Sequence, residues 1–283
     1  ISGFASTNTS GTATLATNGS QYAIGVYDNS QDEWTNYTTG TVGAAGNFDI
    51  GKGYAMASVS GGTGLLAFTG TIATTDQTQA IIDNDAANSG SGRRWDLIAN
   101  PFPSFINAND DAHASNNFLT VNTSKLHDTY EAVYGYDADG TGYTAYNHTY
   151  SSNTAVYIAP GQGFMVASDN TSSDTVSFTE AMQSVSGAND FVDDVMNDSY
   201  EVLLILYHGD DQIEETRLYF EEGLSLGLDP GYDAGAFDQN SAIMTRLVED
   251  DAGHGLAINA MSTDHMNDVV IPLIINQDAG QEF

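Results

Sequence analysis

The sequence repeats itself at an almost constant distance, and this repeat constrains the fold more than any other feature. A Tyr-Asp pair followed by two aromatic residues occurs twice with the same internal spacing. The first occurrence is Tyr27-Asp28 with Trp34 and Tyr37, and the second, 109 residues later (27 to 136), is Tyr136-Asp137 with Tyr143 and Tyr146. Such self-similarity indicates that one supersecondary unit has been duplicated.

A second block of matches continues the repeat at an offset of 110 (51 to 161). Gly51-Lys52-Gly53-Tyr54 corresponds to Gly161-Gln162-Gly163-Phe164, and Phe68-Thr69 corresponds to Phe178-Thr179. Each copy is predicted to be a meander of short strands, with a Gly-x-Gly corner that permits positive φ or a close backbone approach. Residue alternation predicts that four side chains point inward: Leu66, Phe68, Val176 and Phe178.

The stretch Trp95–Ile106 (WDLIANPFPSFI) is predicted to open the second copy. Its apolar strand must leave the sheet at Asn100-Pro101, because proline removes a backbone donor and forces the preceding residue into an extended conformation. The sequence leaves open whether the bonds before Pro101 and Pro103 are cis or trans. By the same repeat, Ile1-Ser2-Gly3 is expected to be the remnant of an equivalent corner in the first copy.

These patterns predict an all-β fold of tandem β-sandwich or jelly-roll-like modules, internally duplicated, with a third β-sandwich unit. Glycine is abundant (29 residues), which suits short strands joined by tight turns. The duplicated pair covers 1–187, with copy one at 1–73, a linker at 74–94 and copy two at 95–187. Gln79–Ile82 is a candidate strand within the linker, and Phe105–Thr129 is expected to hold the only short helix. The acidic third unit covers 188–283 and starts with a hairpin formed by Tyr200–Tyr207 and Gln212–Phe220.

The chain is strongly acidic, with a formal net charge of −32. Such a surface repels phosphate backbones and anionic headgroups, so neither nucleic-acid binding nor direct membrane insertion is predicted. It suits a salty outside medium and attracts divalent cations. The absence of cysteine excludes disulfides and thiolate zinc sites. The abrupt ends, Ile1-Ser2-Gly3 and Gln281-Glu282-Phe283, are expected to be cuts within a larger protein.

No catalytic motif is convincing, and we predict that the chain is not an enzyme. Gly223-Leu224-Ser225-Leu226-Gly227 matches G-x-S-x-G, but it follows an acidic hairpin rather than lying between a strand and a helix, so a loop is expected. The six histidines show no zinc-binding spacing and are predicted to be surface or turn residues. Carboxylates are too abundant for any pair to be diagnostic of glycosidase chemistry.

Calcium is the one cofactor for which the sequence offers candidate ligands. Asp137 and Asp139 begin a D-x-D-G stretch, although the downstream bidentate glutamate of an EF-hand is missing. Asp229 and Asp233 form a second carboxylate-glycine turn. Simple Asp-Gly turns explain both stretches equally well.

Trp34, Tyr37, Tyr143 and Tyr146 are the candidate ligand-binding residues. Four aromatic rings could form a platform on which sugars stack. Their occurrence at equivalent positions of both copies favours a packing role as half-buried cross-strand pairs.

Four stretches carry a resemblance to a known family. WDLIANPFPSFI resembles the GWNLIGNPYPS stretch of large extracellular proteins of Bacteroidota that are exported by the type IX secretion system, although Ala99 stands where glycine is usual. Tyr157–Phe164 (YIAPGQGF) and the blocks Thr216–Phe220 and Asp229–Ala234 are also similar to segments of these proteins. The resemblance implies an extracellular or cell-surface location, shortly before a C-terminal sorting domain beyond Phe283.

The function expected from these features is a non-enzymatic structural or adhesive segment of a large secreted cell-surface protein. Its edge strands would join neighbouring subunits in a multimer or filament, so the expected partners are other copies of the chain or other surface proteins. The alternative is a carbohydrate-binding module attached to a secreted polysaccharide-degrading enzyme, with a polysaccharide as the partner.

Overall fold

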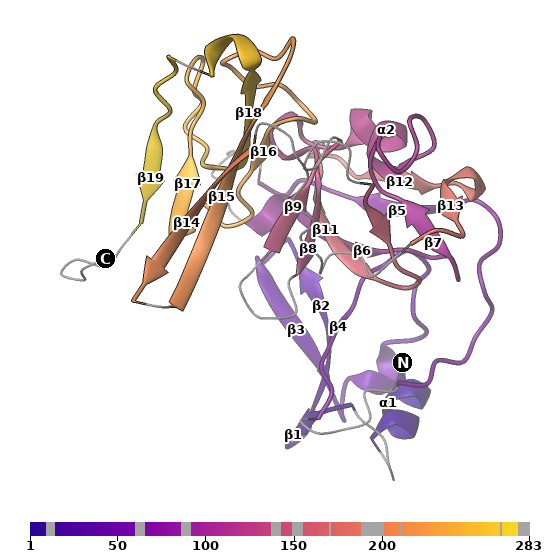
Figure 1. Ribbon diagram of the computed structural model, residues 1–283. Coiled ribbons are helices and arrows are strands. Elements are labelled where there is room, and N and C mark those ends of the chain that lie inside the picture. The colour runs from indigo at the N-terminus through magenta and orange to yellow at the C-terminus, as the bar shows by residue number, and fades with distance from the viewer. Residues whose placement is uncertain are drawn as a thin grey trace.

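The chain folds into an all-β, sandwich-like architecture of three parts (Figure 1). We call these the N-terminal module (residues 1–73), the middle module (74–187) and the C-terminal sheet (201–276). The computed structural model describes residues 1–9, 15–59, 66–85, 92–136, 143–148, 155–169, 171–187, 201–209, 211–266 and 268–276. Within these residues, no helix is long and apolar enough to cross a membrane.

The N-terminal module consists of a small sheet and one helix packed around Ile24. Strand β2 lies at the centre of this sheet and pairs with β1, β3 and β4. The elements are α1 (Ser2–Asn8), β1 (Thr17–Asn18), β2 (Gln21–Asp28), β3 (Glu33–Thr38), η1 (Val42–Ala44) and β4 (Ala55–Met56).

The middle module contains three small sheets around the largest core of the chain. One has the order β6-β11-β8-β9, another the order β10-β7-β13, and β5 pairs with β12. The elements are β5 (Gln77–Ile81), η2 (Gly92–Arg94), β6 (Trp95–Ala99), β7 (Phe105–Asn107), α2 (Phe118–Asn122), η3 (Thr123–Lys125), η4 (Asp128–Tyr130), β8 (Val133–Tyr136), β9 (Tyr143–Tyr146), β10 (Tyr157–Ile158), β11 (Gly163–Ala167), β12 (Asp174–Phe178), η5 (Glu180–Met182) and β13 (Gln183–Ser184).

The strand register confirms the duplication. Tyr27 lies opposite Trp34, and Tyr136 lies opposite Tyr143 at the offset of 109 (27 to 136). The two copies also pair alike across the point where the offset changes from 109 to 110. Gly25 lies opposite Ala55 in the first copy, and the equivalent residues Tyr134 and Met165 lie opposite each other in the second. The first glycine of each corner has positive φ, +79° at Gly51 and +71° at Gly161, as predicted.

A second correspondence between the copies was not predicted from the sequence. Asn8 accepts a hydrogen bond from the backbone N–H of Ala67 and donates to the carbonyls of Phe4 and Ala67. Asn122 makes the same three bonds, accepting from Ser177 N–H and donating to the carbonyls of Phe118 and Ser177. Helix α1 is therefore the counterpart of α2, and a buried asparagine ties each helix to the end of its copy.

This correspondence corrects two expectations. Ser2 and Gly3 belong to helix α1 and are not the remnant of a proline corner. Phe105–Thr129 does hold a helix, α2, but not the only one. Helix α1 was missed because its sequence, SGFASTN, is poor in strong helix formers, so its helical form depends on the burial of Phe4, Ala5 and Asn8.

Strand β6 hydrogen-bonds to both copies. Along one edge it pairs over five residues with β11 of the middle module. Along the other edge, the Ala99 N–H donates to the Gly51 carbonyl (2.9 Å) and the Gly53 N–H donates to the Leu97 carbonyl (3.0 Å). A Cβ on Gly53 would lie 2.4 Å from Leu97 Cγ, which explains the second glycine of the corner as a close approach. The strand that opens copy two is thus also the joint between the copies.

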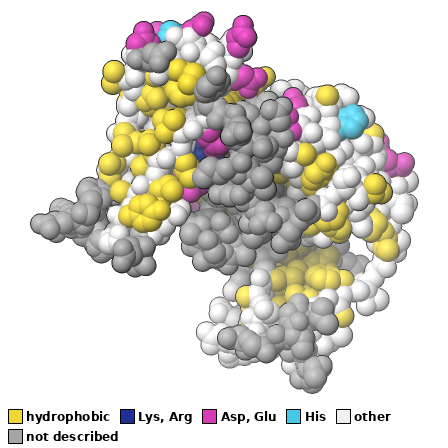
Figure 2. Space-filling model, viewed as in Figure 1, with side chains coloured by type: hydrophobic (Ala, Val, Ile, Leu, Met, Phe, Trp, Pro, Cys, Tyr) yellow, Lys and Arg dark blue, Asp and Glu magenta, His cyan; other side chains and the backbone are white. Residues whose placement is uncertain are grey.

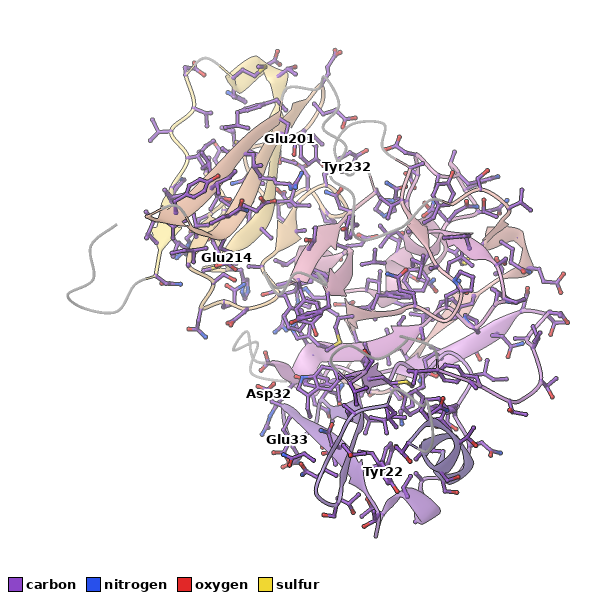
Figure 3. The ribbon with its side chains drawn as sticks, turned by 60° about the horizontal axis from the view of Figure 1, so that its bottom comes forward. Tyr22, Asp32, Glu33, Glu201, Glu214 and Tyr232 are labelled. Carbon is purple, nitrogen blue, oxygen red and sulfur yellow. The ribbon has the colours of Figure 1, made fainter. Side chains whose placement is uncertain are left out.

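Further contacts fix the same boundary. The Tyr27 hydroxyl donates to the carbonyl of Gly92 (2.7 Å), and Gly92 N–H donates to Asp32 at the β2–β3 turn, which reaches the middle module (Figure 3).

All described peptide bonds are trans, including those before Pro101 and Pro103. The segment 74–94, expected to be a linker, contributes β5 to the middle module. Of the four side chains expected to point inward, Val176 and Phe178 are fully buried, whereas Phe68 is 61% exposed.

The C-terminal sheet has six strands, and part of one face packs against the middle module. Tyr219, Ile258 and Ala260 belong to the core of the middle module, and Phe237 stacks on Tyr143 with ring centroids 4.1 Å apart. The strand order is β14-β15-β18-β17-β19, with β16 beside β18. The elements are β14 (Glu201–His208), β15 (Asp211–Glu221), β16 (Ala234–Gly235), β17 (Ile243–Thr245), β18 (Leu256–Ser262), η6 (Thr263–His265) and β19 (Leu273–Ile275).

Candidate functional site

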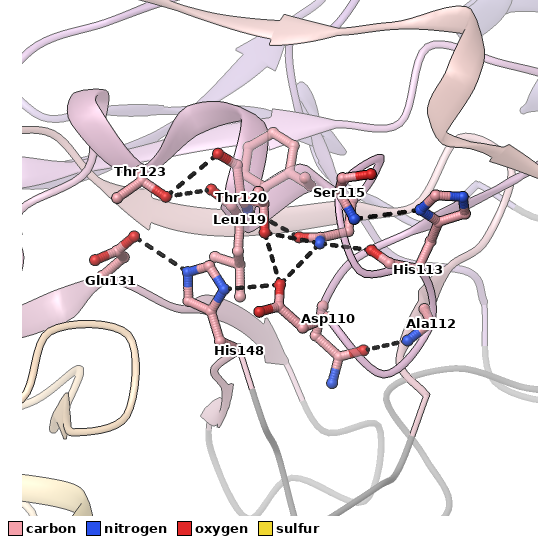
Figure 4. Close-up of polar contacts among 12 residues, drawn as sticks. Asp110, Ala112, His113, Ser115, Leu119, Thr120, Thr123, Glu131 and His148 are labelled. Carbon is pink, nitrogen blue, oxygen red and sulfur yellow. Dashed lines mark hydrogen bonds and ion pairs between the residues drawn. The ribbon is translucent and has the colours of Figure 1, made fainter. Parts of the chain in front are cut away.

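A group of three charged or titratable side chains lies where the middle module meets the C-terminal sheet. We call Asp110, Glu131 and His148 the junction cluster (Figure 4). His148 Nδ1 lies 3.0 Å from Asp110 Oδ1, and His148 Nε2 lies 3.2 Å from Glu131 Oε1. The three residues follow β7, η4 and β9, so three separate segments converge on one histidine.

Neighbouring polar groups hold the cluster in place. Asp110 also accepts hydrogen bonds from the Thr120 hydroxyl (2.6 Å) and from Asn117 Nδ2 (2.9 Å). Asn117 is the N-cap of α2, so the short helix positions this carboxylate. His148 and Glu131 are mostly buried, which leaves little water to weaken their attraction.

The cluster is in contact with the C-terminal sheet. His148 N–H donates to the Gly231 carbonyl (3.0 Å), and a Cβ on Gly231 would lie 2.5 Å from the His148 ring. The adjacent Asn147 donates to the Tyr232 carbonyl and to the Tyr219 hydroxyl. Tyr232 marks this boundary in Figure 3. The cluster therefore helps to hold the middle module and the C-terminal sheet together.

The electrostatics of the cluster favour a protonated histidine. Burial alone lowers the pKa of His148, but its hydrogen bonds and ion pairs with Glu131 and Asp110 outweigh burial and raise the pKa above the usual value. For Asp110, burial raises the pKa, and the bonds from Thr120, His148 and Asn117 more than reverse this effect. Both ring nitrogens of His148 face carboxylates in the described structure, so neither is left to activate a nucleophile.

Three buried or half-buried acids and bases give the fold a specific pH dependence. Burial raises the pKa of Asp96 and of Asp233 to about 7, and the pKa of His148 is also raised. Each group binds its proton more tightly when folded than when unfolded, where aspartate titrates near ~3.9 and histidine near ~6.5. These three groups should therefore make stability fall as the pH rises from about 5 to about 8, whereas His127 and His254, whose pKa values burial lowers, oppose this fall up to about pH 6.5.

Calorimetric melting temperatures at constant ionic strength would check this expectation. In Asp233→Asn, the melting temperature should fall less steeply with rising pH up to pH 7. In His148→Gln, it should fall less steeply at pH values above the pKa of histidine in the unfolded chain. A melting temperature that rises over this range in the unmodified chain would contradict the assignment.

The four candidate sugar-binding residues do not form one platform. Trp34 and Tyr37 are three residues apart on β3 and point to opposite faces, as do Tyr143 and Tyr146 on β9. Tyr146 is buried, Tyr143 stacks on Phe237, and Tyr37 packs in the N-terminal module. Trp34 alone has a large exposed surface (45%), resting against Tyr27.

The candidate calcium ligands fall into two groups. Asp137 and Asp139 lie outside the described residues, so calcium at that stretch stays a prediction. Asp233 is fully buried, and its two carboxylate oxygens accept from the N–H groups of Asp229 and Ala260. Asp229 accepts from Ser225, which lies in a loop as expected. Within the described ranges, no group of three or more histidine, aspartate or glutamate residues is arranged to hold a metal ion.

The structure adds to one expectation about the histidines. His148 lies in a turn, as expected, but its side chain is only 13% exposed and holds the junction cluster together. No spacing motif could have revealed the cluster, because its members are 38 and 17 residues apart in the chain (110 to 148 and 131 to 148).

Comparison with known proteins gives one match. The model of the family described as domain of unknown function (DUF8693) matches residues 3–283. No curated protein and no solved structure matches the chain.

Proposed function

The chain belongs to the DUF8693 family, and we propose that it serves as a non-enzymatic structural or adhesive segment of a large secreted cell-surface protein. In this proposal it associates with neighbouring copies or with other surface proteins through its C-terminal sheet. The acidic composition and the resemblance to exported proteins support the extracellular location. The observation that carries the proposal is an apolar sheet face that the middle module covers only in part.

The register of the C-terminal sheet defines this face. Residues directly opposite one another lie on the same face of a sheet. Leu273 of β19 lies opposite Thr245 of β17, and Thr245 lies opposite Leu256 of β18, so these three side chains share a face. Leu256 alternates along β18 with the core residues Ile258 and Ala260, which therefore lie on the same face. Leu203 of β14 also lies on it, because it is opposite Arg217 of β15 and Arg217 is opposite Ile258; Tyr207, four residues after Leu203 on β14, points the same way.

The part of this face that extends beyond the middle module is exposed. Tyr207, Leu273 and Ile275 retain 48%, 47% and 45% of their surface. Tyr207 lies on β14 at one end of the strand order, and Leu273 and Ile275 lie on β19 at the other end. We call these three residues together the open face. Hydrophobic side chains gather on the exposed surface of the C-terminal sheet in Figure 2. Among the residues that the structure describes, β14 pairs only with β15, so its other edge has no partner strand there. Exposed apolar patches and long free edges are typical of surfaces that bind another protein.

Self-association through the open face should depend on salt. Two chains of charge −32 repel each other, and this repulsion is screened as the Debye length falls from about 10 Å at 0.1 M to about 3 Å at 1 M salt. The weight-average mass in sedimentation experiments should therefore rise with protein concentration, and more steeply at high salt. Tyr207→Ser/Leu273→Ser should abolish the rise.

A matched control separates the open face from general hydrophobicity. Ile72→Ser/Val185→Ser also removes two exposed apolar side chains, but from other parts of the surface. This control should associate like the unmodified chain. An unmodified chain that stays monomeric at high concentration and high salt would contradict self-association.

The exposed Trp34 supports the alternative of a carbohydrate-binding module. An exposed indole packed on a second ring is a suitable surface for sugar stacking. Specific glycan binding that is lost in Trp34→Ala would favour this alternative over the structural function.

A further inference from the structure

The two copies use the same sheet face differently, and the comparison points to a binding surface on the N-terminal module. In the middle module, β8 and β9 turn one face toward the C-terminal sheet. Tyr143 of this face stacks on Phe237, and the Tyr134 hydroxyl donates to the Gly235 carbonyl (2.9 Å). Tyr134 and Ala145 retain only 1% and 4% of their surface. In the second copy, this face is therefore covered by another part of the chain.

The equivalent face of the N-terminal module is exposed. The strand register identifies its residues at the offset of 109 (34 to 143): Trp34 for Tyr143, Asn36 for Ala145 and Gly25 for Tyr134. Trp34 retains 45% of its surface, and Asn36 is also exposed. The first copy thus keeps an aromatic ring on this face, but an amide and a glycine replace the two residues that the C-terminal sheet buries. We call Gly25, Trp34 and Asn36 the indole face.

The glycine and the asparagine of the indole face form one local unit. A Cβ on Gly25 would lie 2.3 Å from Asn36 Oδ1, so the missing side chain makes room for the Asn36 amide. No described residue hydrogen-bonds to this amide, which offers two N–H donors and a carbonyl acceptor. Trp34 lies two residues before Asn36, on the same side of β3. The indole rests against Tyr27, whose hydroxyl is held by the Gly92 carbonyl.

A sugar has the two properties that this pair of side chains requires. Its C–H groups pack against an aromatic ring, and its hydroxyls both donate to and accept from an amide. The charge of the β2–β3 hairpin selects among sugars. Residues 21–38 include Asp28, Asp32 and Glu33 but neither lysine nor arginine, and two of these acids are labelled in Figure 3. Such a surface repels uronates and sulfated sugars.

We propose that the indole face binds a neutral polysaccharide, with a sugar ring on Trp34 and sugar hydroxyls on the Asn36 amide. A protein sheet is a poorer occupant, because the indole face lacks the apolar side chains with which the second copy holds the C-terminal sheet. This inference deepens the carbohydrate-binding alternative given above and rests on it, since it names the class of sugar and the residue that acts beside Trp34. It does not rest on association through the open face, which lies on the C-terminal sheet.

Quenching of tryptophan fluorescence by acrylamide tests the proposal, because Trp34 is accessible and the other tryptophan, Trp95, is only 1% exposed. The probes are soluble β-glucan, galactomannan, xylan and dextran, each compared with its own sulfated derivative. At least one neutral polysaccharide should protect Trp34 from acrylamide, and its sulfated derivative should bind about tenfold more weakly at low salt. Binding of the neutral form should not change between about 0.1 M and about 1 M salt, in contrast to self-association through the open face.

Retardation in native gels that contain the polysaccharide measures the variants, since Trp34→Ala removes the fluorescent probe. Trp34→Ala should weaken binding about tenfold or more, and Trp34→Tyr should restore most of it. Asn36→Ala, which installs the residue of the second copy, should weaken binding about fivefold, the usual effect of losing a neutral hydrogen bond. Tyr136→Ala is the matched control: it removes the 59% exposed tyrosine of the second copy and should bind like the unmodified chain.

The failures of the proposal and of the alternative on which it rests are distinguishable. Protection by no polysaccharide, neutral or sulfated, in a chain with an intact circular dichroism spectrum would overturn both. Binding of sulfated polysaccharides alone, lost in Trp34→Ala, would overturn the proposed class of sugar and leave the alternative standing. Binding of a neutral polysaccharide that persists unchanged in Trp34→Ala or in Asn36→Ala would also overturn the proposal.

Discussion

Replacing Trp95 by alanine is expected to lower the free energy of unfolding by about 3–5 kcal/mol, the usual cost of removing a fully buried aromatic side chain. The Trp95 side chain is 1% exposed, and its ring packs against Tyr130 and Tyr134 of the middle module. It also contacts Phe237, with ring centroids 4.5 Å apart, so the substitution weakens the contact with the C-terminal sheet as well. Urea unfolding followed by far-ultraviolet circular dichroism would measure the loss.

Trp34 provides a matched control, since the chain has only two tryptophans. Trp34 lies at the equivalent of Tyr143 in the first copy and is half-exposed, so Trp34→Ala should cost about 1 kcal/mol or less. In each variant the fluorescence of the remaining tryptophan reports on its own surroundings. Equal losses for the two variants would contradict the assignment of Trp95 to the core.

Replacing Arg94 by methionine is expected to have a comparable effect. Arg94 Nη2 lies 2.7 Å from Asp85 Oδ2, and the two side chains are only 1% and 3% exposed. The guanidinium also lies over the Tyr130 ring, 4.9 Å from its centroid. Arg94→Met leaves the Asp85 carboxylate buried without this partner, which typically costs about 3–5 kcal/mol.

A second variant distinguishes the broken pair from lost packing. Arg94→Met/Asp85→Leu removes both charges, and it should recover most of the stability because the uncompensated charge is gone. Lys125→Met serves as the control, because the pair between Lys125 and Asp174 is partly exposed and should contribute less than about 1 kcal/mol. A double variant as unstable as Arg94→Met would show that the packing of the Arg94 side chain, rather than its charge, matters.

The parts of the fold that could be predicted from the sequence are those with local signals. The Tyr-Asp pairs and Gly-x-Gly corners fix where strands end, and their constant spacing fixed the register of β2 with β3 and of β8 with β9. The proline corner marked β6 as a strand that ends at Ala99. These features depend on backbone conformation within a few residues, so the sequence carries them directly.

The parts that could not be predicted depend on residues far apart in the chain. Helix α1 is held by Asn8, whose partner Ala67 lies 59 residues away. The junction cluster combines three loops, and no spacing rule connects them. Phe68, which alternation predicted to point inward, is 61% exposed and packs against Phe4 and Phe48. Local patterns specify strands, but the tertiary contacts decide which faces are covered.

Strand β6 joins the copies through two backbone hydrogen bonds that NMR can observe directly. Scalar couplings across hydrogen bonds should connect the Gly53 amide nitrogen with the Leu97 carbonyl carbon, and the Ala99 amide nitrogen with the Gly51 carbonyl carbon. Both couplings should appear together with slow exchange of the two amide protons. Rapid exchange at both amides and no coupling across either bond, in a chain whose β6–β11 couplings are intact, would contradict the joint.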